Sequence, residues 1–215
     1  MTDQTPEIGP GGRTSEPTFP RADAELIERF RNLPTANIVD VMDRLGAADR
    51  AIKPVWPGAR LAGSAFTIWT RPGDNLGIHR SLESVQPGDV IVVNGGGDEN
   101  RALIGELIGG RAKVAGAEGF VIDGAVRDAD GLAQYDMPVF ARAQTPAGPY
   151  KDGPFITCVA VAMGGVVVQP GDIVVADADG VAVIPLASAA IIAERAEAKY
   201  AQEEAARAEI EAGLG

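Results

Sequence analysis

The sequence of 215 residues contains a single cysteine, Cys158, and a single histidine, His79. One cysteine excludes an intramolecular disulfide framework and is typical of a reducing compartment, so we expect a cytoplasmic protein. A catalytic cysteine usually needs a histidine nearby, and Cys158 lies in an apolar segment. We therefore interpret Cys158 as a small core residue.

Positive charge is also scarce, because 19 Lys and Arg residues stand against 30 Asp and Glu residues and give a net charge of -11. Proteins that bind nucleic acids need clustered Lys and Arg for phosphate contacts, so we expect no nucleic-acid partner. A small anionic substrate would have to be held by a local positive site.

The sequence has no long apolar run. The longest, residues 158–168, is too short to cross a bilayer and carries glycines in its middle. Residues 1–20 lack the cationic start and apolar stretch of a signal peptide, so we expect neither a leader nor a membrane partner. An apolar content of 46% is enough for one substantial core, which predicts a single α/β domain.

The chain divides into three predicted regions. Residues 1–20 are rich in proline and glycine and are predicted to be a flexible arm. Residues 21–186 are predicted to form the α/β domain. Residues 187–215 are predicted to be a long helix whose isoleucines are too sparse for a core helix, so part of it should pack on a neighbouring subunit or stand in solvent.

Hydrophobic periodicity locates the main elements. Helices are predicted from Asp23 to Phe30 and over residues 35–46, the second capped by Thr35 and ended by Gly46. A helix over residues 100–116 between two strands indicates a right-handed crossover in a parallel sheet. The β-like segments, short and rich in branched or aromatic residues, are 61–70, 89–94, 119–123 and 138–143.

A weak internal repeat is present, because QPGDVIVVN at 86–94 recurs as QPGDIVVAD at 169–177. Pro-Gly fits the centre of a type II turn, so each copy should begin a strand. A reused turn and a duplication both fit this similarity. The second copy is predicted to continue through a hairpin turn at Asp179-Gly180 into a strand at 181–185.

The glycine-rich segment NGGGDEN, residues 94–100, is predicted to join a strand to a helix. Its glycines would let the backbone bind an anion, or would form a purely structural turn. It is not a dinucleotide fingerprint, since Asn100 stands where the third glycine belongs. It is not a P-loop, since no Gly-Lys-Ser/Thr follows.

The strand at 119–123 ends in GAVRDADGL, which brings Arg127, Asp128 and Asp130, while Glu106 lies on the preceding helix. The carboxyl ends of parallel strands meet at one edge of a sheet, so these side chains can face one cleft. Carboxylates with an arginine and no thiol suit Mg²⁺ or Mn²⁺. Alternatively, Asp128 and Asp130 only decorate a helix N-terminus.

Four stretches together resemble the 4-hydroxy-4-methyl-2-oxoglutarate/4-carboxy-4-hydroxy-2-oxoadipate aldolase family, and the resemblance spans roughly residues 35 to 213. It implies a metal-dependent class II pyruvate aldolase with a compact swivelling β/β/α (RraA-like) core, forming homotrimers or homohexamers with active sites between subunits. The family's relatives include RraA-like regulators of ribonuclease activity. The stretches are 94-NGGGDENRALIGELI-108, 119-GFVIDGAVRDADGL-132, 145-TPAGPYKDGP-154 and 164-GGVVVQPGDIVVADADGVAVIP-185.

The resemblance implies a role for several acidic residues. Asp128 would be the direct metal ligand, and Glu106 would hold a metal-bound water, although aspartate is more usual at that position. A glutamate from the C-terminal helix of the neighbouring subunit would complete the metal shell through water. Glu203 is the best match for this glutamate, ahead of Glu204 and Glu197.

The resemblance also implies how the substrate is held. Arg127 would contact the pyruvyl oxygen, and His79 and Asp40 fall where the family has a histidine and an acidic residue near a water. The general base would be water held by Glu106 or water near Asp40 and His79. The substrate carboxylate would be cradled by the backbone N–H groups of Gly105, Glu106, Leu107 and Ile108.

The chemistry of the reaction fits this set of residues. Cleaving a carbon-carbon bond next to a 2-oxo acid leaves pyruvate enolate, whose charge a metal ion and Arg127 would stabilise. No Schiff-base lysine is needed, and none lies at a strand end in the motif region. The lysines considered are Lys53, Lys113, Lys151 and Lys199.

The same enolate chemistry predicts oxaloacetate decarboxylation as a side activity. Two alternatives to the aldolase are a non-catalytic RraA-like regulator and a related lyase acting on another 2-oxo acid. RraA-type regulators commonly lack the acidic residue after the arginine. Asp128, which follows Arg127, therefore favours the enzyme.

Overall fold

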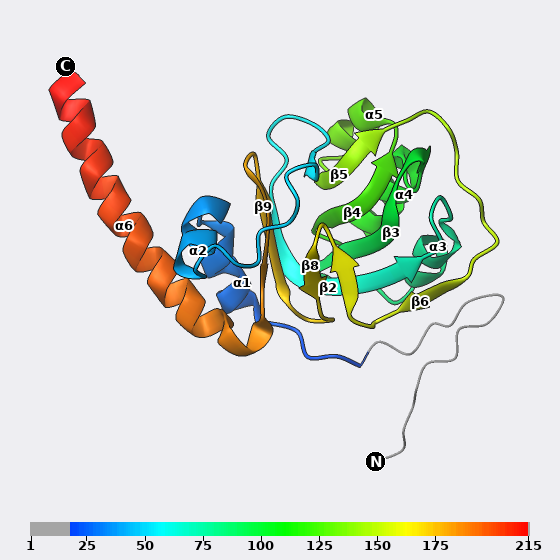
Figure 1. The fold of residues 1–215 in the computed structure, drawn as a ribbon, viewed down its shortest axis with the longest axis horizontal. Helices are drawn as coiled ribbons and strands as arrows, with labels where there is room; N and C mark the ends of the chain where they lie inside the picture. Colours follow the sequence, from blue (N-terminus) through cyan, green and yellow to red (C-terminus); the bar gives the residue numbers. More distant parts are fainter. Residues whose placement is uncertain (1–17, 215) are drawn as a thin grey trace, which may run out of the picture.

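The protein has a mixed α/β fold built on one eight-stranded sheet (Figure 1). The structure is a computed structural model that describes residues 18–214, so the predicted arm over residues 1–20 lies almost wholly outside the described residues. The strands of the sheet are β1 (Lys53–Pro54), β2 (Leu61–Thr70), β3 (Asp89–Ala102), β4 (Gly119–Val126), β5 (Val139–Gln144), β6 (Phe155–Thr157), β9 (Ile173–Asp177) and β10 (Gly180–Ile184).

Four of these strands form a parallel core. The strand order is β1-β5-β4-β3-β2-β9-β10, with β6 paired to the end of β2. Strands β2, β3, β4 and β5 are mutually parallel, while β1, β6, β9 and β10 pair antiparallel. The predicted strands and the predicted parallel crossover between β3 and β4 are therefore confirmed.

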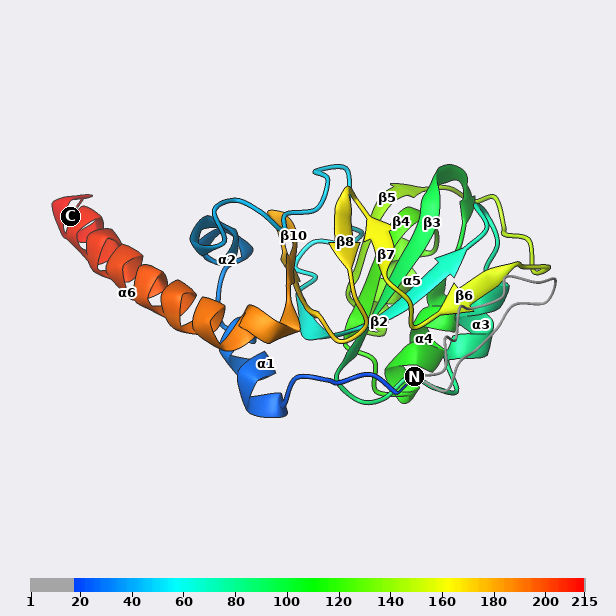
Figure 2. The same cartoon turned by 60° about the horizontal axis from the view of Figure 1, so that its bottom comes forward.

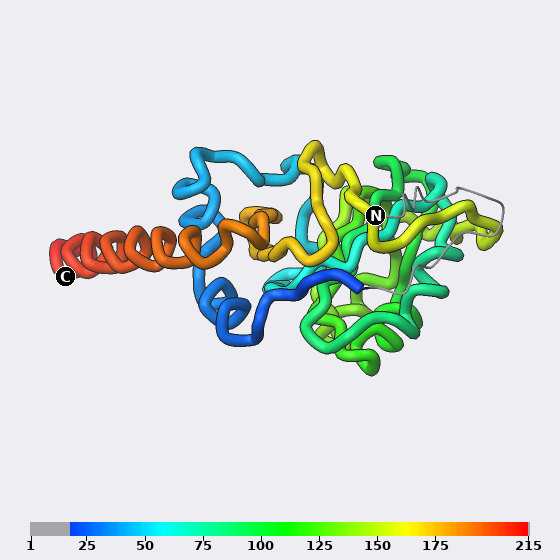
Figure 3. The backbone as a smooth tube through the Cα atoms, turned by 90° about the horizontal axis from the view of Figure 1, so that it is seen from below, coloured from blue at the N-terminus to red at the C-terminus, as the bar shows by residue number. Residues whose placement is uncertain are grey.

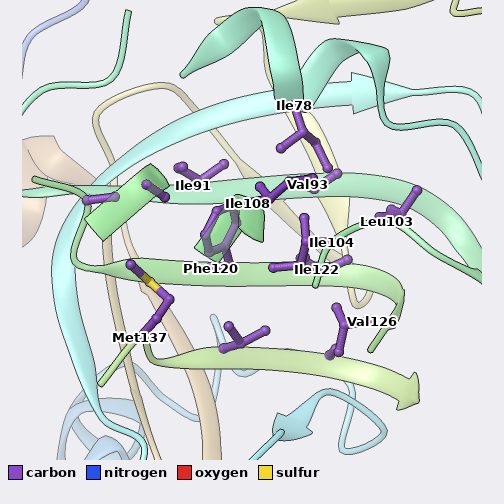
Figure 4. Packing of buried hydrophobic residues seen from close by; sticks show 14 of the residues in the cluster. Ile78, Ile91, Val93, Leu103, Ile104, Ile108, Phe120, Ile122, Val126 and Met137 are labelled. Atoms are coloured by element: carbon purple, nitrogen blue, oxygen red, sulfur yellow. The ribbon is translucent and has the colours of Figure 1, made fainter. Parts of the chain in front are cut away.

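Helices cover one face of the sheet, and a hairpin covers the other (Figure 2). The helices are α3 (Leu76–Ser81), α4 (Glu106–Val114) and α5 (Ala129–Gln134), and the hairpin is β7 (Val161–Met163) with β8 (Val166–Val168). Side chains alternate between the two faces of a strand. Ile91 and Val93 therefore belong to the core under the helices, and Val90 and Val92 belong to the core under the hairpin. Figure 4 shows the core on the helix side, packed around Phe120.

A third group of helices packs at the β9–β10 end of the sheet. They are α1 (Ala24–Arg31), α2 (Thr35–Val41) and the long α6 (Ala189–Leu214), which follows a 3₁₀ turn at Leu186–Ser188. Phe30 and Ile38 are fully buried between them and the sheet. Asp23 caps α1 by accepting a hydrogen bond from the N–H of Leu26 at 2.8 Å, which confirms the predicted start of that helix.

The prediction of a helix over residues 35–46 is wrong in its length and its cap. The helix stops at Val41, because Asp43 and Arg44 take left-handed backbone angles that no α-helix continues. Thr35 does not cap the helix, since its hydroxyl donates instead to the buried carboxylate of Asp177 at 2.6 Å. Leu45, which the predicted helix would have included, lies outside the helix and is 71% exposed.

The prediction that residues 94–100 join a strand to a helix is also wrong. After Gly96 and Gly97, which have positive φ, β3 resumes pairing with β4, and it ends only at Ala102. The following helix begins at Glu106 and not near residue 100. Glycines at these two positions let the strand bulge and continue, so they extend β3.

The two QPGD segments form the same turn on the two sides of β2. Gly88 and Gly171 have φ values of 89° and 90°, as the predicted type II turns require. Asp89 and Asp172 each accept a hydrogen bond at 2.8 Å from the backbone N–H of the glutamine three residues earlier. Strand β3 then runs parallel to β2, and β9 runs antiparallel to it.

The C-terminal half of α6 projects beyond the rest of the described chain (Figure 3). Its buried residues, Ala189, Ile192, Ala193 and Ala196, all belong to its first two turns. The hairpin before it is confirmed, although its turn consists of Ala178 and Asp179, and Gly180 already pairs in β10. Within residues 18–214, no helix is both long and apolar enough to cross a membrane.

Candidate active site

A cavity of about 360 Å³ opens at the start of α4, beside the carboxyl end of β4. Backbone hydrogen bonds align these segments, since Leu103 N–H donates to Ala125 O at 2.8 Å and Arg127 N–H donates to Ile104 O at 3.0 Å. The residues that line the cavity are Asn75, His79, Ala102, Leu103, Ile104, Gly105, Glu106, Leu107, Ile108, Arg111, Arg127, Asp128, Pro149 and Lys151.

Asp128 has an unusual backbone and side-chain placement. Its φ of 58° and ψ of 45° lie in the left-handed region, which is unfavourable for a residue with a side chain. Although it immediately precedes α5, its carboxylate makes no capping hydrogen bond to that helix. Oδ2 instead accepts a hydrogen bond from Glu106 N–H at 3.3 Å and lies 3.5 Å from Arg127 Nε. Asp128 therefore does not cap α5, and its carboxylate lies instead at the first N–H of α4, whereas Asp130 lies in the first turn of α5.

Two glycines leave room for the two carboxylates. A Cβ at Gly105 would lie 2.2 Å from Asp128 Oδ2, and a Cβ at Gly131 would lie 2.1 Å from Glu106 Oε2. Since such approaches are impossible, any larger residue at either position would displace a carboxylate. Asp128 and Glu106 therefore occupy space that is open only because positions 105 and 131 are glycine.

The cavity is rich in positive charge, although the protein as a whole is acidic. Arg127, Arg111 and Lys151 line it against the carboxylates of Asp128 and Glu106. Sequence reasoning missed Arg111 and Lys151. A signal for Arg111 was its place on the same helix as Glu106, just over one turn later. A signal for Lys151 was its place in the 145–154 motif, although it follows no strand directly.

His79 and Asn75 carry the unpartnered polar atoms of the cavity. Asn75 Oδ1 and His79 Nε2 are buried and have no hydrogen-bond partner in the part of the chain that the structure describes. Burial lowers the pKa of His79 below its ordinary value of 6.5, and the charges of Lys151 and Arg111 lower it further. His79 is therefore neutral at pH 7. Asn75, another residue that sequence reasoning missed, donates from Nδ2 to Leu103 O at 2.9 Å.

Asp40 and Glu203 do not line this cavity within one chain. They lie together where α2 meets α6, joined by Lys199, whose Nζ is 3.2 Å from Asp40 Oδ2 and 2.7 Å from Glu203 Oε1. Asn37 donates a further hydrogen bond to Glu203 at 2.7 Å. The hydrogen bond from Lys199, followed by that from Asn37, lowers the pKa of Glu203, so this carboxylate is ionised at neutral pH.

The glycine-rich segment of β3 contributes nothing to the cavity, whose lining begins only at Ala102 on that strand. The predicted backbone anion site at residues 94–100 is therefore not part of this pocket. Among residues 18–214, no group of three or more His, Cys, Asp or Glu side chains lies close enough together to hold a metal ion. Asp128 and Glu106 together supply only two carboxylates.

The fold and cavity define an α/β protein with a polar pocket lined by two carboxylates, two arginines and a lysine. A model of the RraA-like family, described as Aldolase/RraA, matches residues 35–183, and the chain belongs to this family. A protein of Halalkalibacterium halodurans, named provisionally as a 4-hydroxy-4-methyl-2-oxoglutarate aldolase, is 38% identical over 185 residues. That match covers 86% of this chain and 88% of the relative.

Solved structures agree with this assignment. Streptomyces coelicolor RraAS2, described as an unusual member of the RNase ES inhibitor RraA protein family, superimposes with a TM-score of 0.79 and 30% identity, covering 88% of this chain and 100% of that one. An uncharacterized protein from Pseudomonas syringae pv. tomato gives a TM-score of 0.82 at 28% identity, covering 91% and 96% of the two chains. The predicted RraA-like α/β fold is therefore confirmed.

Proposed function

We propose that the protein is a divalent-metal-dependent aldolase that cleaves 4-hydroxy-2-oxo acids of the 4-hydroxy-4-methyl-2-oxoglutarate type to pyruvate. The observation that carries this proposal is the placement of Asp128. Its left-handed backbone turns the carboxylate away from α5 and toward Glu106 and Arg127, at the mouth of a cationic pocket. Strained backbone of this kind is concentrated at functional sites. The name of the H. halodurans relative supports the same reaction.

The donors in the pocket fit a hard divalent cation such as Mg²⁺ or Mn²⁺. Asp128 and Glu106 offer carboxylate oxygens, and no thiol lines the cavity in the described chain. Asp128 would hold the ion directly, and Glu106 would act through water. Such an ion, when bound, supplies Lewis-acid stabilisation of negative charge on the keto oxygen of the substrate.

Arg127 would also stabilise the negative charge on the keto oxygen of the substrate. In the cleavage, a base takes the proton of the 4-hydroxyl, the C3–C4 bond breaks, and its electron pair becomes the enolate of pyruvate. Arg127 lines the cavity, and its guanidinium would stabilise the negative charge on that enolate oxygen. The first N–H groups of α4 have no acceptor within the helix, and Leu107 and Ile108 would direct theirs to the substrate carboxylate.

His79 is suited to the proton transfer. Its lowered pKa keeps the imidazole neutral at pH 7, and Nε2 is a buried atom without a partner in the described chain. A neutral imidazole accepts a proton through a water and returns it to the enolate carbon. The cations Arg111 and Lys151 would bind the second carboxylate of a dicarboxylic substrate.

A second subunit would complete the site. Asp40 and Glu203, to which the resemblance assigns separate roles, share one ion cluster on the exposed face of α2 and α6. Helices without tertiary contacts are marginal in water, and every residue of α6 from Glu204 to Leu214 is exposed in the described chain. We therefore propose a homotrimer or homohexamer in which this cluster reaches the pocket of a neighbour, in a cytoplasmic protein.

The test is pyruvate release from 4-hydroxy-4-methyl-2-oxoglutarate and from oxaloacetate, whose decarboxylation gives the same enolate. Release should require Mg²⁺ or Mn²⁺, stop with EDTA and disappear in Asp128→Ala. Asp130→Ala is the matched control, because Asp130 lies two residues away and only begins α5. Activity that survived both EDTA and Asp128→Ala would exclude the metal assignment.

The second candidate is a non-catalytic regulator of ribonuclease activity, which the likeness to RraAS2 favours. A purified protein that bound an RNase E-type enzyme and released no pyruvate with either metal would support it. A third candidate is a lyase for another 2-oxo acid, since the pyruvyl half of such a substrate would bind at the same end of the pocket. Release of pyruvate from oxaloacetate but not from 4-hydroxy-4-methyl-2-oxoglutarate would favour that lyase.

A further inference from the structure

The outer wall of the pocket is made by two segments that are distant in sequence. Residues 71–79 supply Asn75 and His79, and residues 148–153 supply Pro149 and Lys151. The two segments pair through their backbones, because Tyr150 N–H donates to Gly73 O at 2.8 Å and Asn75 N–H donates to Tyr150 O at 3.0 Å. The shape of this wall therefore depends on what holds the segments together.

The carboxylate of Asp74 is the buried side chain that joins them. Asp74 is fully buried, and its Oδ2 accepts hydrogen bonds from the backbone N–H groups of Asp152 at 2.8 Å and Gly153 at 2.9 Å. Oδ1 accepts from Leu76 N–H at 2.9 Å, at the start of the helix that carries His79. Arg71 Nη2 donates a fourth bond at 2.9 Å.

We propose that Asp74 is a positioning residue of the pocket, whose carboxylate holds the 150–153 segment so that Lys151 stays in the wall beside His79. Hydrogen bonds to a carboxylate are stronger than those between neutral groups, so four of them on one buried side chain resist opening of the wall. The expected effect of Asp74 on substrate binding rests on the proposed function. Its expected effect on the shape of the wall does not depend on that function.

Asp172 provides a matched control for the loss of a buried carboxylate. It too is buried, and it accepts from Gln169 N–H at 2.8 Å and Leu186 N–H at 3.2 Å. It lies at the start of β9 and does not line the pocket. Asp74→Ala and Asp172→Ala should both destabilise the fold, but only Asp74→Ala should change the pocket.

The first readout is the titration of His79, followed by NMR in tag-free protein without added metal. His79 is the single histidine of the chain, so its resonance is unambiguous. Its pKa is lowered by burial and by the charge of Lys151. If the wall opens in Asp74→Ala, water reaches His79 and Lys151 moves away from it, so the pKa of His79 should rise toward 6.5. In Asp172→Ala the pKa of His79 should stay at the wild-type value. An unchanged pKa in Asp74→Ala, or an equal rise in both variants, would overturn the proposal.

The second readout separates KM from kcat for pyruvate release. Loss of Lys151 from the wall should raise the KM of a dicarboxylic substrate by about tenfold in Asp74→Ala, with kcat changed much less. Asp172→Ala should leave KM unchanged. A fall in kcat at constant KM in Asp74→Ala would contradict a positioning role. If wild type releases no pyruvate at all, the proposed function fails, and the His79 titration still decides the role of Asp74.

Hydrogen exchange in the wild-type protein tests the same idea even if Asp74→Ala does not fold. The amide protons of Asp152 and Gly153 should be strongly protected although they lie in a surface loop, because both bond to Asp74. Exchange of these two amides at the rate of unprotected loop residues would show that Asp74 does not hold the segment.

Discussion

Gly105 and Asp128 touch so closely that a Cβ added at position 105 would lie 2.2 Å from Asp128 Oδ2. The φ of Gly105 is -145°, which any residue adopts, so the main obstacle to alanine there is the Asp128 carboxylate and not the backbone. We predict that Gly105→Ala displaces this carboxylate and lowers metal-dependent pyruvate release on the order of 100-fold, as small misplacements in active sites commonly do. Calorimetric titration with Mn²⁺ should show weaker binding in parallel.

Gly110→Ala on the same helix is the control for that substitution. A Cβ there would meet the ring of Tyr135 at 3.3 Å, and this ring is 48% exposed and free to shift. Replacing a glycine inside a helix is worth up to about 1 kcal/mol of stability, so Gly110→Ala should fold and remain active. Wild-type activity in Gly105→Ala would show that the Asp128 carboxylate is not a metal ligand.

Removing the guanidinium of Arg127 should affect the rate more than binding. An electrostatic donor aimed at developing charge contributes mainly in the transition state, so Arg127→Met should lower kcat by roughly 100-fold to 1000-fold with a smaller change in KM. Steady-state kinetics with oxaloacetate measure both constants. Arg60→Met is the control, because Arg60 does not line this pocket. A pure KM effect in Arg127→Met would assign Arg127 to substrate binding alone.

The pH profile should report the neutral state of His79. Because burial and nearby cations lower its pKa, the imidazole is neutral above that pKa and becomes protonated as the pH falls through it. We predict that kcat/KM falls on the acid side with a midpoint below 6.5. Lys151→Met removes a positive charge, so this midpoint should move to higher pH, whereas Lys53→Met should leave it in place. If the midpoint does not move in Lys151→Met, the group that titrates in the kcat/KM profile is not His79.

Mixed oligomers test whether Glu203 acts in a neighbour's pocket. Asp128→Ala and Glu203→Gln should each be inactive alone. When the two are co-expressed in equal amounts, about a quarter of the subunit contacts would join an intact Asp128 to an intact Glu203, so about a quarter of the activity should return. Glu204→Gln provides the matched control, because Glu204 pairs with Arg207 and not with Lys199. No recovery in verified mixed oligomers would place the whole site within one chain.

The parallel core was predictable from the sequence because each of its strands is a short apolar run bounded by turn residues. Arg127, Asp128 and Glu106 were predictable for a related reason, since ligands gather at the carboxyl ends of parallel strands. The structure brings these three residues together, as expected. It also brings in His79, whose role had depended on the family resemblance alone.

Other features depend on contacts between distant segments, which periodicity does not report. The helix at Thr35 is shortened by left-handed residues at Asp43 and Arg44, and the Thr35 hydroxyl prefers a buried partner 142 residues away. Lys151 lines the pocket next to a loop that is bound by Asp74, 78 residues away in the sequence. Such effects are set by tertiary structure, and hydrophobic periodicity does not report them.

The two QPGD turns have a consequence for reading the ancestry of this chain. Ser64 of β2 pairs with Asp89 on one side and with Ile173 on the other, so the two turns stand at one level of the same strand. The strands they begin nevertheless run in opposite directions relative to each other. A buried aspartate that closes the turn can therefore begin a strand in either direction, and the repeated sequence needs no more than this local requirement to explain it.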